Sequence, residues 1–507
     1  MRTVLLSKSD ELYLEKCAQE HSFSYGIIIG HQADVSKSIV VHLARNSEED
    51  ADLEDLTDVR LTIRDINSQA LASQWLSASK MCPGSFDVIG IFIASVRPDV
   101  ANEHSEEFKN AKKVFSDVYD LLLKTNNSFG VYTTDMAQTD FVFLSYSLAD
   151  KTLLCKNYTY GKHCKKTYFT ANIKCIICGG TFSNMDFRFV EKPFEWIQFE
   201  CNYDLDDVIP IVDTTRRINI EEQFQNIIST IRKYLIASEV FLQNELIDDT
   251  MDLQTFIKKK KLKDDKLKTN STSSAGGAAN PSASSAASSM HLLSPIESSS
   301  GGVIRANIIM PVKCQLDNPK DIKVREFSGT LRMSGMIFSR VYCNPRNSIA
   351  DVKRYLRDDV LRSLITRIQV YCDGLTDPHV SNEAVYISEP PRRVFFAIPS
   401  DGSSTSGNAV QFSEYLFRGE APTVVVAQAK QVLDVELDPE TIYLDAEGLP
   451  DDVNFNSMQT DTEGEDSRRL TSTMPKRELS RSLYMVGIAV ALLVLLASVA
   501  LHYTMNG

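Results

Sequence analysis

The chain has 507 residues, a formal net charge of −13 and ten cysteines. This length leaves room for two or three domains that each bury their own core. The negative charge argues against a general nucleic-acid-binding protein, because phosphate backbones attract basic surfaces. The cysteines are too thinly spread for the disulfide framework of a small secreted domain, so we expect reduced thiols.

The first residues do not predict a secretory signal. Lys8, Asp10 and Glu11 follow an apolar run of only three residues, whereas the apolar core of a signal peptide needs about 7 to 15. We therefore expect the N-terminus in the cytosol.

Three apolar segments and one helix define the first unit. FSYGIIIG and SIVVHLAR are typical of two strands around a polar turn, residues 67–80 are predicted to be helical, and FDVIGIFIAS is predicted to be a buried strand. The order strand, strand, helix, strand resembles the MPN fold, the scaffold of the zinc isopeptidases that remove ubiquitin-like modifiers. We expect an α+β protein whose N-terminal region, residues 1–255, begins with a degenerate MPN-like domain.

The resemblance also indicates where an active MPN protein carries its chemistry. Active members have a glutamate three residues before the glycine that matches Gly26, and a His-x-His pair after the pattern matched by residues 88–90. This chain has Phe23, Ile93 and Ser95 at those positions. Without two imidazoles and a general base, a zinc-bound water can be neither held nor activated. The resemblance therefore implies a domain without catalytic residues and without a cofactor.

A second metal candidate surrounds the sequence CIIC. It lacks the second tight cysteine pair of most zinc ribbons, and isoleucines between the cysteines are typical of a buried strand. We favour ordinary core cysteines over a zinc site. The residues concerned are His163, Cys164, Cys175 and Cys178, with Cys155 and Cys201 as outliers.

Residues 256–302 are rich in lysine and then in serine, alanine and glycine, a composition that cannot bury apolar area. They predict a disordered linker. Before it, the apolar spacing of residues 218–246 predicts one long helix. After it, residues 303–433 predict a second α+β unit in the cytosol. Its expected elements are the strands VIRANIIMPVKCQL, TLRMSGMIFSRVYC and RRVFFAIP and a helix over residues 349–370.

The C-terminal part predicts a membrane anchor. Residues 434–482 are acidic and uneven and are expected to form a flexible stalk. The 19 residues from Leu483 to Leu501 carry no charge and are long enough for a single transmembrane helix. Lys476, Arg477 and Arg481 precede this run, so the positive-inside rule places the body in the cytosol and residues 502–507 in the lumen. The short span favours the thinner endoplasmic reticulum membrane.

Taken together, YGIIIGHQ, DVIGIFIAS, EWIQFEC, PRRVFFAIP and the C-terminal anchor resemble the odorant-response-abnormal-four family. Membership implies an endoplasmic reticulum protein that supports folding and trafficking of seven-helix receptors, including odorant receptors. It also implies a partner, the cysteine protease that processes the ubiquitin-fold modifier, which such proteins recruit to the membrane.

Three functions compete at this point. The first is a membrane adaptor of this kind. The second is a divergent isopeptidase, which bound zinc would reveal. The third is a membrane tether or trafficking factor without a protease partner. A tether of the coiled-coil kind needs a long heptad pattern beside its anchor, and residues 434–480 carry prolines, glycines and acids instead.

Overall fold

The computed structural model describes most of the first 447 residues. The described ranges are 2–34, 36–47, 62–129, 140–160, 180–191, 194–211, 217–261, 303–310, 329–374, 391–398, 409–417 and 419–447. They fall within one compact unit, Met1–Leu449.

An eight-stranded mixed sheet dominates the N-terminal part, with the strand order β7-β6-β5-β4-β2-β3-β1-β8. The predicted order of strand, strand, helix and strand is confirmed by β2, β3, α2 and β4, and β2 lies between β3 and β4. The strands are β1 (Thr3–Ser7), β2 (Phe23–Asp34), β3 (Lys37–Arg45), β4 (Asp87–Ser95), β5 (Asp140–Ser147), β6 (Thr152–Thr159), β7 (Thr181–Asn184) and β8 (Asp186–Val190).

The two edges of this sheet meet at Met185. Although β7 and β8 are consecutive, they pair with opposite ends of the strand order, β6 and β1. The Met185 N–H donates to the Cys155 carbonyl at 3.3 Å, and the Asp186 N–H donates to the Arg2 carbonyl at 2.9 Å. The chain therefore passes from one edge of the sheet to the other within a single residue.

Helices cover both faces of the sheet. On one face α1 (Lys8–Glu20) packs on a cluster that includes Ile28 and Phe92. Ser7 and Asp10 form a capping box at its first turn. On the other face α2 (Ser68–Met81) and α3 (Glu106–Phe129) cover a larger cluster around Ile91. Strand residues alternate between these clusters, as the period of two requires.

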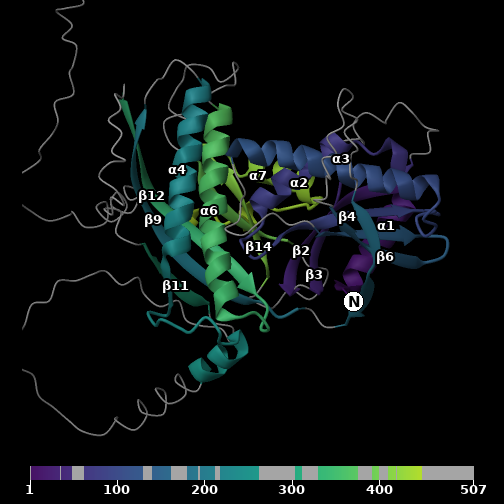
Figure 1. Cartoon of the computed structure of the whole chain (residues 1–507), viewed down its shortest axis with the longest axis horizontal. Coiled ribbons are helices and arrows are strands. Elements are labelled where there is room, and N and C mark those ends of the chain that lie inside the picture. Colours follow the sequence, from purple (N-terminus) through teal and green to yellow (C-terminus); the bar gives the residue numbers. More distant parts are fainter. Residues whose placement is uncertain are drawn as a thin grey trace, which may run out of the picture. The chain divides into compact units, whose positions relative to one another are not determined.

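A second sheet has the order β10-β11-β9-β12, with α4 (Arg217–Ala237) and α6 (Ile349–Gly374) packed together on its apolar face (Figure 1). The strands are β9 (Ile197–Ile211), β10 (Glu239–Leu242), β11 (Ile304–Ile309) and β12 (Gly329–Cys343). The predicted strands at β11 and β12 and the predicted helix at α6 are confirmed.

Residues 256–302 were expected to separate two units, but the structure shows strands pairing across this segment. β9 and β10 precede this segment, yet both pair with β11, which follows it. β9 also pairs with β12 over its whole length. The segment therefore interrupts one sheet, and the second sheet is completed from both sides of it. Composition marks such a segment, but it cannot reveal which strands pair across it.

The helix predicted over residues 218–246 ends early. α4 stops at Ala237, and the N–H and hydroxyl of Ser238 both donate to the Leu235 carbonyl, at 3.1 and 2.6 Å. Val240 and Leu242 follow as alternate buried residues of β10. Their spacing of two residues is that of a strand, but the run is too short to stand out from the long helical pattern before it.

The last described segment packs against both sheets. β13 (Arg392–Ala397), which was predicted, pairs with β14 (Gln411–Leu416), and α7 (Thr423–Leu433) follows. Residues 434–447, which we call the C-terminal strap, were expected to be a flexible stalk. The structure contradicts this for the strap, because four of its apolar side chains are buried and two short 3-10 turns order it. These side chains are Val435, Leu437, Ile442 and Ala446.

Several expectations lie outside the described residues. They concern His163, Cys164, Cys175 and Cys178, the linker from residue 262, and the anchor from Leu483 to Leu501. The first residues of the expected disordered linker, 256–261, are helical instead, and Phe256 is buried among them. Among the helices that the structure describes, none is long and apolar enough to cross a membrane.

Candidate functional site

The three positions singled out by the MPN resemblance come together on neighbouring strands. In the antiparallel pair of β2 and β4, Phe23 lies directly opposite Ser95, and Tyr25 lies opposite Ile93. The backbone thus brings the three positions together at one end of this strand pair. What the position can do depends on the side chains there.

Those side chains belong to the apolar core. Ile93 is 1% exposed and Phe23 is 8% exposed, and both lie in the cluster beneath α2 and α3. The Phe23 and Tyr25 rings are 6.2 Å apart. A phenyl ring and an aliphatic side chain offer no lone pair to a metal and cannot accept a proton. This position can therefore contribute packing but not zinc chemistry.

Two serines lie side by side at the end of β4 and β5. Ser95 is opposite Ser147 of β5, and its carbonyl accepts the N–H of Leu148 at 3.0 Å. The Ser147 hydroxyl donates to Asp150 Oδ2 at 3.1 Å. Across the described part of the chain, no three His, Cys, Asp or Glu side chains are grouped so that they could hold a metal ion.

The two described cysteines near the CIIC region do not form a group. Cys155 lies on β6 of the first sheet and Cys201 on β9 of the second, and both are buried. Burial raises the pKa of each thiol to about 12. Such thiols stay protonated at neutral pH and behave as small apolar side chains.

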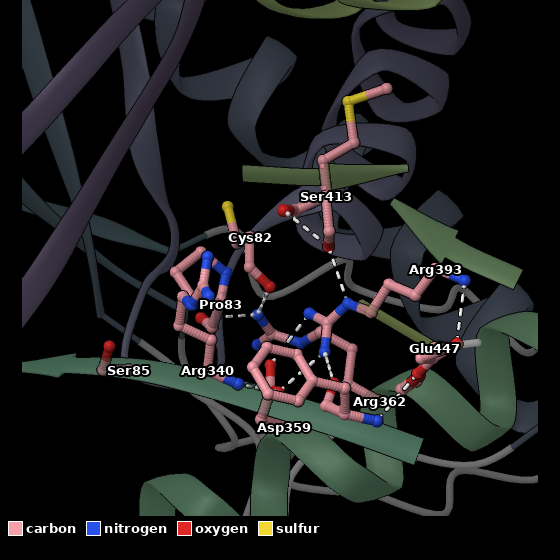
Figure 2. A network of polar contacts seen from close by, with 12 residues as sticks. Cys82, Pro83, Ser85, Arg340, Asp359, Arg362, Arg393, Ser413 and Glu447 are labelled. Carbon is pink, nitrogen blue, oxygen red and sulfur yellow. Dashed lines mark hydrogen bonds and ion pairs between the residues drawn. The ribbon is translucent and has the colours of Figure 1, made fainter. Parts of the chain in front are cut away.

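A buried network of charged groups lies where the second sheet meets the loop before β4 (Figure 2). At its centre Arg393 of β13 donates to both carboxylate oxygens of Asp359 on α6, at 2.7 and 3.0 Å. Neither side chain has exposed surface. The Arg393 Nε also donates to the Ser413 hydroxyl at 2.9 Å. These bonds satisfy most hydrogen-bonding groups of the ion pair, which would otherwise be costly to bury.

Arg362 of α6 binds the loop between α2 and β4. Its Nη1 lies within 3.1 Å of the carbonyl oxygens of Cys82, Pro83 and Phe86, and its Nη2 lies 3.3 Å from an Asp87 carboxylate oxygen. The approach is close enough that a Cβ atom at Gly84 would clash with the backbone of α6. The loop before β4 therefore packs directly on the backbone of α6, and Arg362 adds hydrogen bonds to the same loop.

Side chains from three separate segments occupy the free edge of β12. The N–H groups of Phe338, Arg340 and Tyr342 point away from β9. They donate to Glu447 Oε1, Asp359 Oδ2 and Ser85 Oγ, at 2.8, 3.3 and 3.1 Å respectively. An edge strand with unpaired donors is prone to add a foreign strand, and these bonds block that edge over residues 338–342.

Glu447 holds the C-terminal strap in this network. Both of its carboxylate oxygens lie 2.5 Å from Arg367 Nη2, and Oε2 accepts the Arg393 N–H at 3.0 Å. The strap also pairs with β13 through two hydrogen bonds between Phe395 and Tyr443. At its start, the Tyr13 hydroxyl donates to Asp434 at 2.6 Å. The strap thus connects α1, β13 and the edge of β12.

Sequence reasoning did not find this network. A weak signal was present, since Arg393 stands inside the apolar strand RRVFFAIP and an arginine buried in a strand needs a carboxylate partner. Glu447 gave no signal, because it stands among other acids in a stretch without periodicity.

Comparison with known proteins decides the family. The family model described as "Odorant response abnormal 4-like" matches residues 26–444. The chain belongs to this ODR4-like family. Its relatives include "Protein odr-4 homolog" of Drosophila melanogaster, 72% identical over 510 residues that cover 100% of this chain and 99% of the relative. The protein of the same name from Mus musculus is 19% identical, with 99% of each chain covered. The resemblance expected from the sequence is thereby confirmed.

Among solved structures, this ODR4-like chain is similar to the crystal structure of UfSP from C. elegans. The match has 8% identity and a TM-score of 0.40, and it covers 86% of this chain and 57% of that one. A score this low does not establish a shared fold, and we draw no conclusion from it.

Proposed function

We propose that this ODR4-like protein is a non-catalytic adaptor at the endoplasmic reticulum membrane. In this proposal residues 483–501 anchor it as a single-pass protein, and its body supports folding and trafficking of seven-helix, odorant-type receptors. The body also recruits the cysteine protease of the ubiquitin-fold modifier. The link to odorant response rests on the family and on relatives named odr-4 homologs. The anchor, the membrane and the protease rest on the sequence analysis.

One observation carries the non-catalytic part of the proposal. The MPN-like position holds Phe23 and Ile93, and both are packed in the core under α2 and α3. Opening this position to a substrate would expose the apolar core of the first sheet. Burial of side chains of this size stabilises a domain by about 1.5 to 3 kcal/mol each, so the fold resists such opening.

The buried network supports the adaptor part. An adaptor must present surfaces in a fixed arrangement, and Arg362, Arg393 and Glu447 bind the first sheet, the second sheet and the strap to one another. Since the strap is the segment from which the chain continues toward residues 483–501, its attachment would fix the point at which the chain leaves the body.

Direct binding tests the proposal. Purified full-length protein in detergent is mixed with the purified modifier protease, and complex formation is followed by light scattering after size-exclusion chromatography. We expect a complex, with no zinc-dependent cleavage of modifier-linked substrate by this protein alone. Zinc-dependent cleavage would favour a divergent isopeptidase, and absence of a complex would favour a trafficking factor without a protease partner.

A further inference from the structure

His31 is fully buried where the first sheet meets the second. It lies on β2, and its two ring nitrogens face two oxygens from different segments. Nδ1 is 2.8 Å from the carbonyl oxygen of Ser85, in the loop before β4. Nε2 is 3.2 Å from Oδ1 of Asn347, in the turn before α6. A carbonyl oxygen can only accept, so each contact needs a proton on the ring nitrogen.

The orientation of the Asn347 amide is fixed by a second contact. Oδ1 accepts the backbone N–H of Asn344 at 2.7 Å. Rotating the amide would place its NH₂ group against that N–H, with two donors facing each other. Nδ2 of Asn347 is buried, and it has no hydrogen-bond partner in the described structure. The oxygen therefore faces His31, and only a protonated Nε2 can bond to it.

We propose that His31 is a proton-linked contact between the two sheets, which binds only Ser85 when neutral and bridges Ser85 and Asn347 when protonated. Nδ1 makes the shorter contact and holds the single proton of the neutral ring. Uptake of a second proton on Nε2 turns a contact between two acceptors into a hydrogen bond. The turn at residues 344–347 then becomes bonded to β2.

Some groups around His31 disfavour a second proton on its ring, and others favour it. Three rings, those of Phe86, Trp196 and Tyr355, meet the imidazole edge to face at 5.4 to 6.0 Å and exclude water. The charged groups that act on it are on α6, where the Asp351 carboxylate favours the imidazolium and the Arg354 guanidinium disfavours it. Tyr355, the titratable group in ring contact, stays neutral because burial raises its pKa.

Burial is the dominant influence and lowers the pKa of His31 from its usual 6.5, while the bonds to Ser85 and Asn347 raise it. At neutral pH the ring is therefore neutral and the Asn347 contact lacks its proton. Because the pKa is lower in the folded than in the unfolded state, the stability that His31 contributes above about pH 6.5 is lost as the pH falls. The bridging form is reached on acidification.

Nuclear magnetic resonance of the full-length protein in detergent, with histidines labelled by ¹³C and ¹⁵N, tests this. The chain has eight histidines, and the His31 signal is assigned by its loss in His31→Gln. We expect the neutral His31 ring to carry its proton on Nδ1 and its titration midpoint to lie below about 6.5, the usual value of an imidazole.

Asn347→Asp is the decisive variant, because a carboxylate still accepts the Asn344 N–H but adds a charge beside Nε2. The titration midpoint of His31 should then rise above its value in the wild-type protein. An unchanged midpoint in a folded Asn347→Asp protein would overturn the proposal. If that variant did not fold, a wild-type neutral ring protonated on Nε2 would overturn it equally.

Discussion

Arg393 and Asp359 form a bidentate ion pair in which neither side chain reaches solvent. The pair joins β13 to α6, and Asp359 also accepts the N–H of Arg340 on the edge of β12. One carboxylate therefore links three elements of the chain. Its removal would leave a fully buried guanidinium without its counter-charge, which is far more costly than the loss of an exposed pair.

Asp359→Ala should lower the free energy of unfolding by about 3 to 5 kcal/mol, the range observed when one partner of a buried pair is removed. Denaturant unfolding of the full-length protein measures it. The matched control is Glu436→Ala, which breaks the exposed pair of Glu436 with Lys430 and should cost less than about 1 kcal/mol. Equal effects of the two substitutions would show that the buried pair is not a determinant of stability.

Glu447→Ala should release the C-terminal strap, because it removes the acceptor of Arg367 and of two backbone N–H groups. We expect a loss of about 3 kcal/mol and faster proteolytic cleavage within residues 434–447. Glu440→Ala is the control, since Glu440 is exposed on the same strap. If both variants were cleaved at the wild-type rate, the attachment of the strap would not depend on Glu447.

Glu414 on β14 should make stability depend on pH. Burial raises the pKa of its carboxyl group to about 7. The folded state therefore holds this proton more tightly than the unfolded state, and the stability that it contributes below about pH 4.5 is lost as the pH rises through 7. Glu414→Gln should raise the melting temperature more at about pH 8 than at about pH 5. A shift of the same size at both pH values would contradict the assignment.

Restoring zinc-site residues should damage the fold and not create an enzyme. Ile93→His and Phe23→Glu each place a polar group in the apolar core, at about 1 to 3 kcal/mol and more for a charge. Ile93→Val is the control and should cost only about 0.5 to 1.5 kcal/mol. The test is a triple variant that combines Ile93→His, Ser95→His and Phe23→Glu. Its unfolding curve should show a loss of stability, and metal analysis should find no bound zinc. Stable zinc binding with isopeptidase activity would refute this view of the site.

Removal of Leu483 to Gly507 tests the proposed anchor. In the proposal only this apolar segment lies in the bilayer, and the rest of the chain before it is cytosolic. The truncated protein should leave the membrane fraction and spread through the cytosol. Carbonate washing of membranes from cells that express each form distinguishes the two. Retention of the truncated form after washing would exclude a single C-terminal anchor.

The sequence was informative where periodicity is local. The pattern of β2, β3, α2 and β4 follows from short apolar runs, a polar turn and one helical segment, and the positions of Phe23 and Ile93 follow from a motif. By contrast, the ion pair of Glu447 with Arg367 joins residues 80 apart, and β9 pairs with β11 across a segment of low complexity. Such contacts depend on how the sheets pack, and no local pattern contains that information.

The central claim is that the protein is an adaptor that holds the modifier protease at the membrane. The most direct measurement is the distribution of that protease between membrane and cytosolic fractions in cells with and without this protein, with its peptidase activity assayed in each fraction. We predict that loss of the protein moves the protease to the cytosol with its activity retained, and that re-expression of the full chain, but not of the form lacking residues 483–507, returns it to the membrane. A protease that stays on the membrane in cells without this protein would contradict the account.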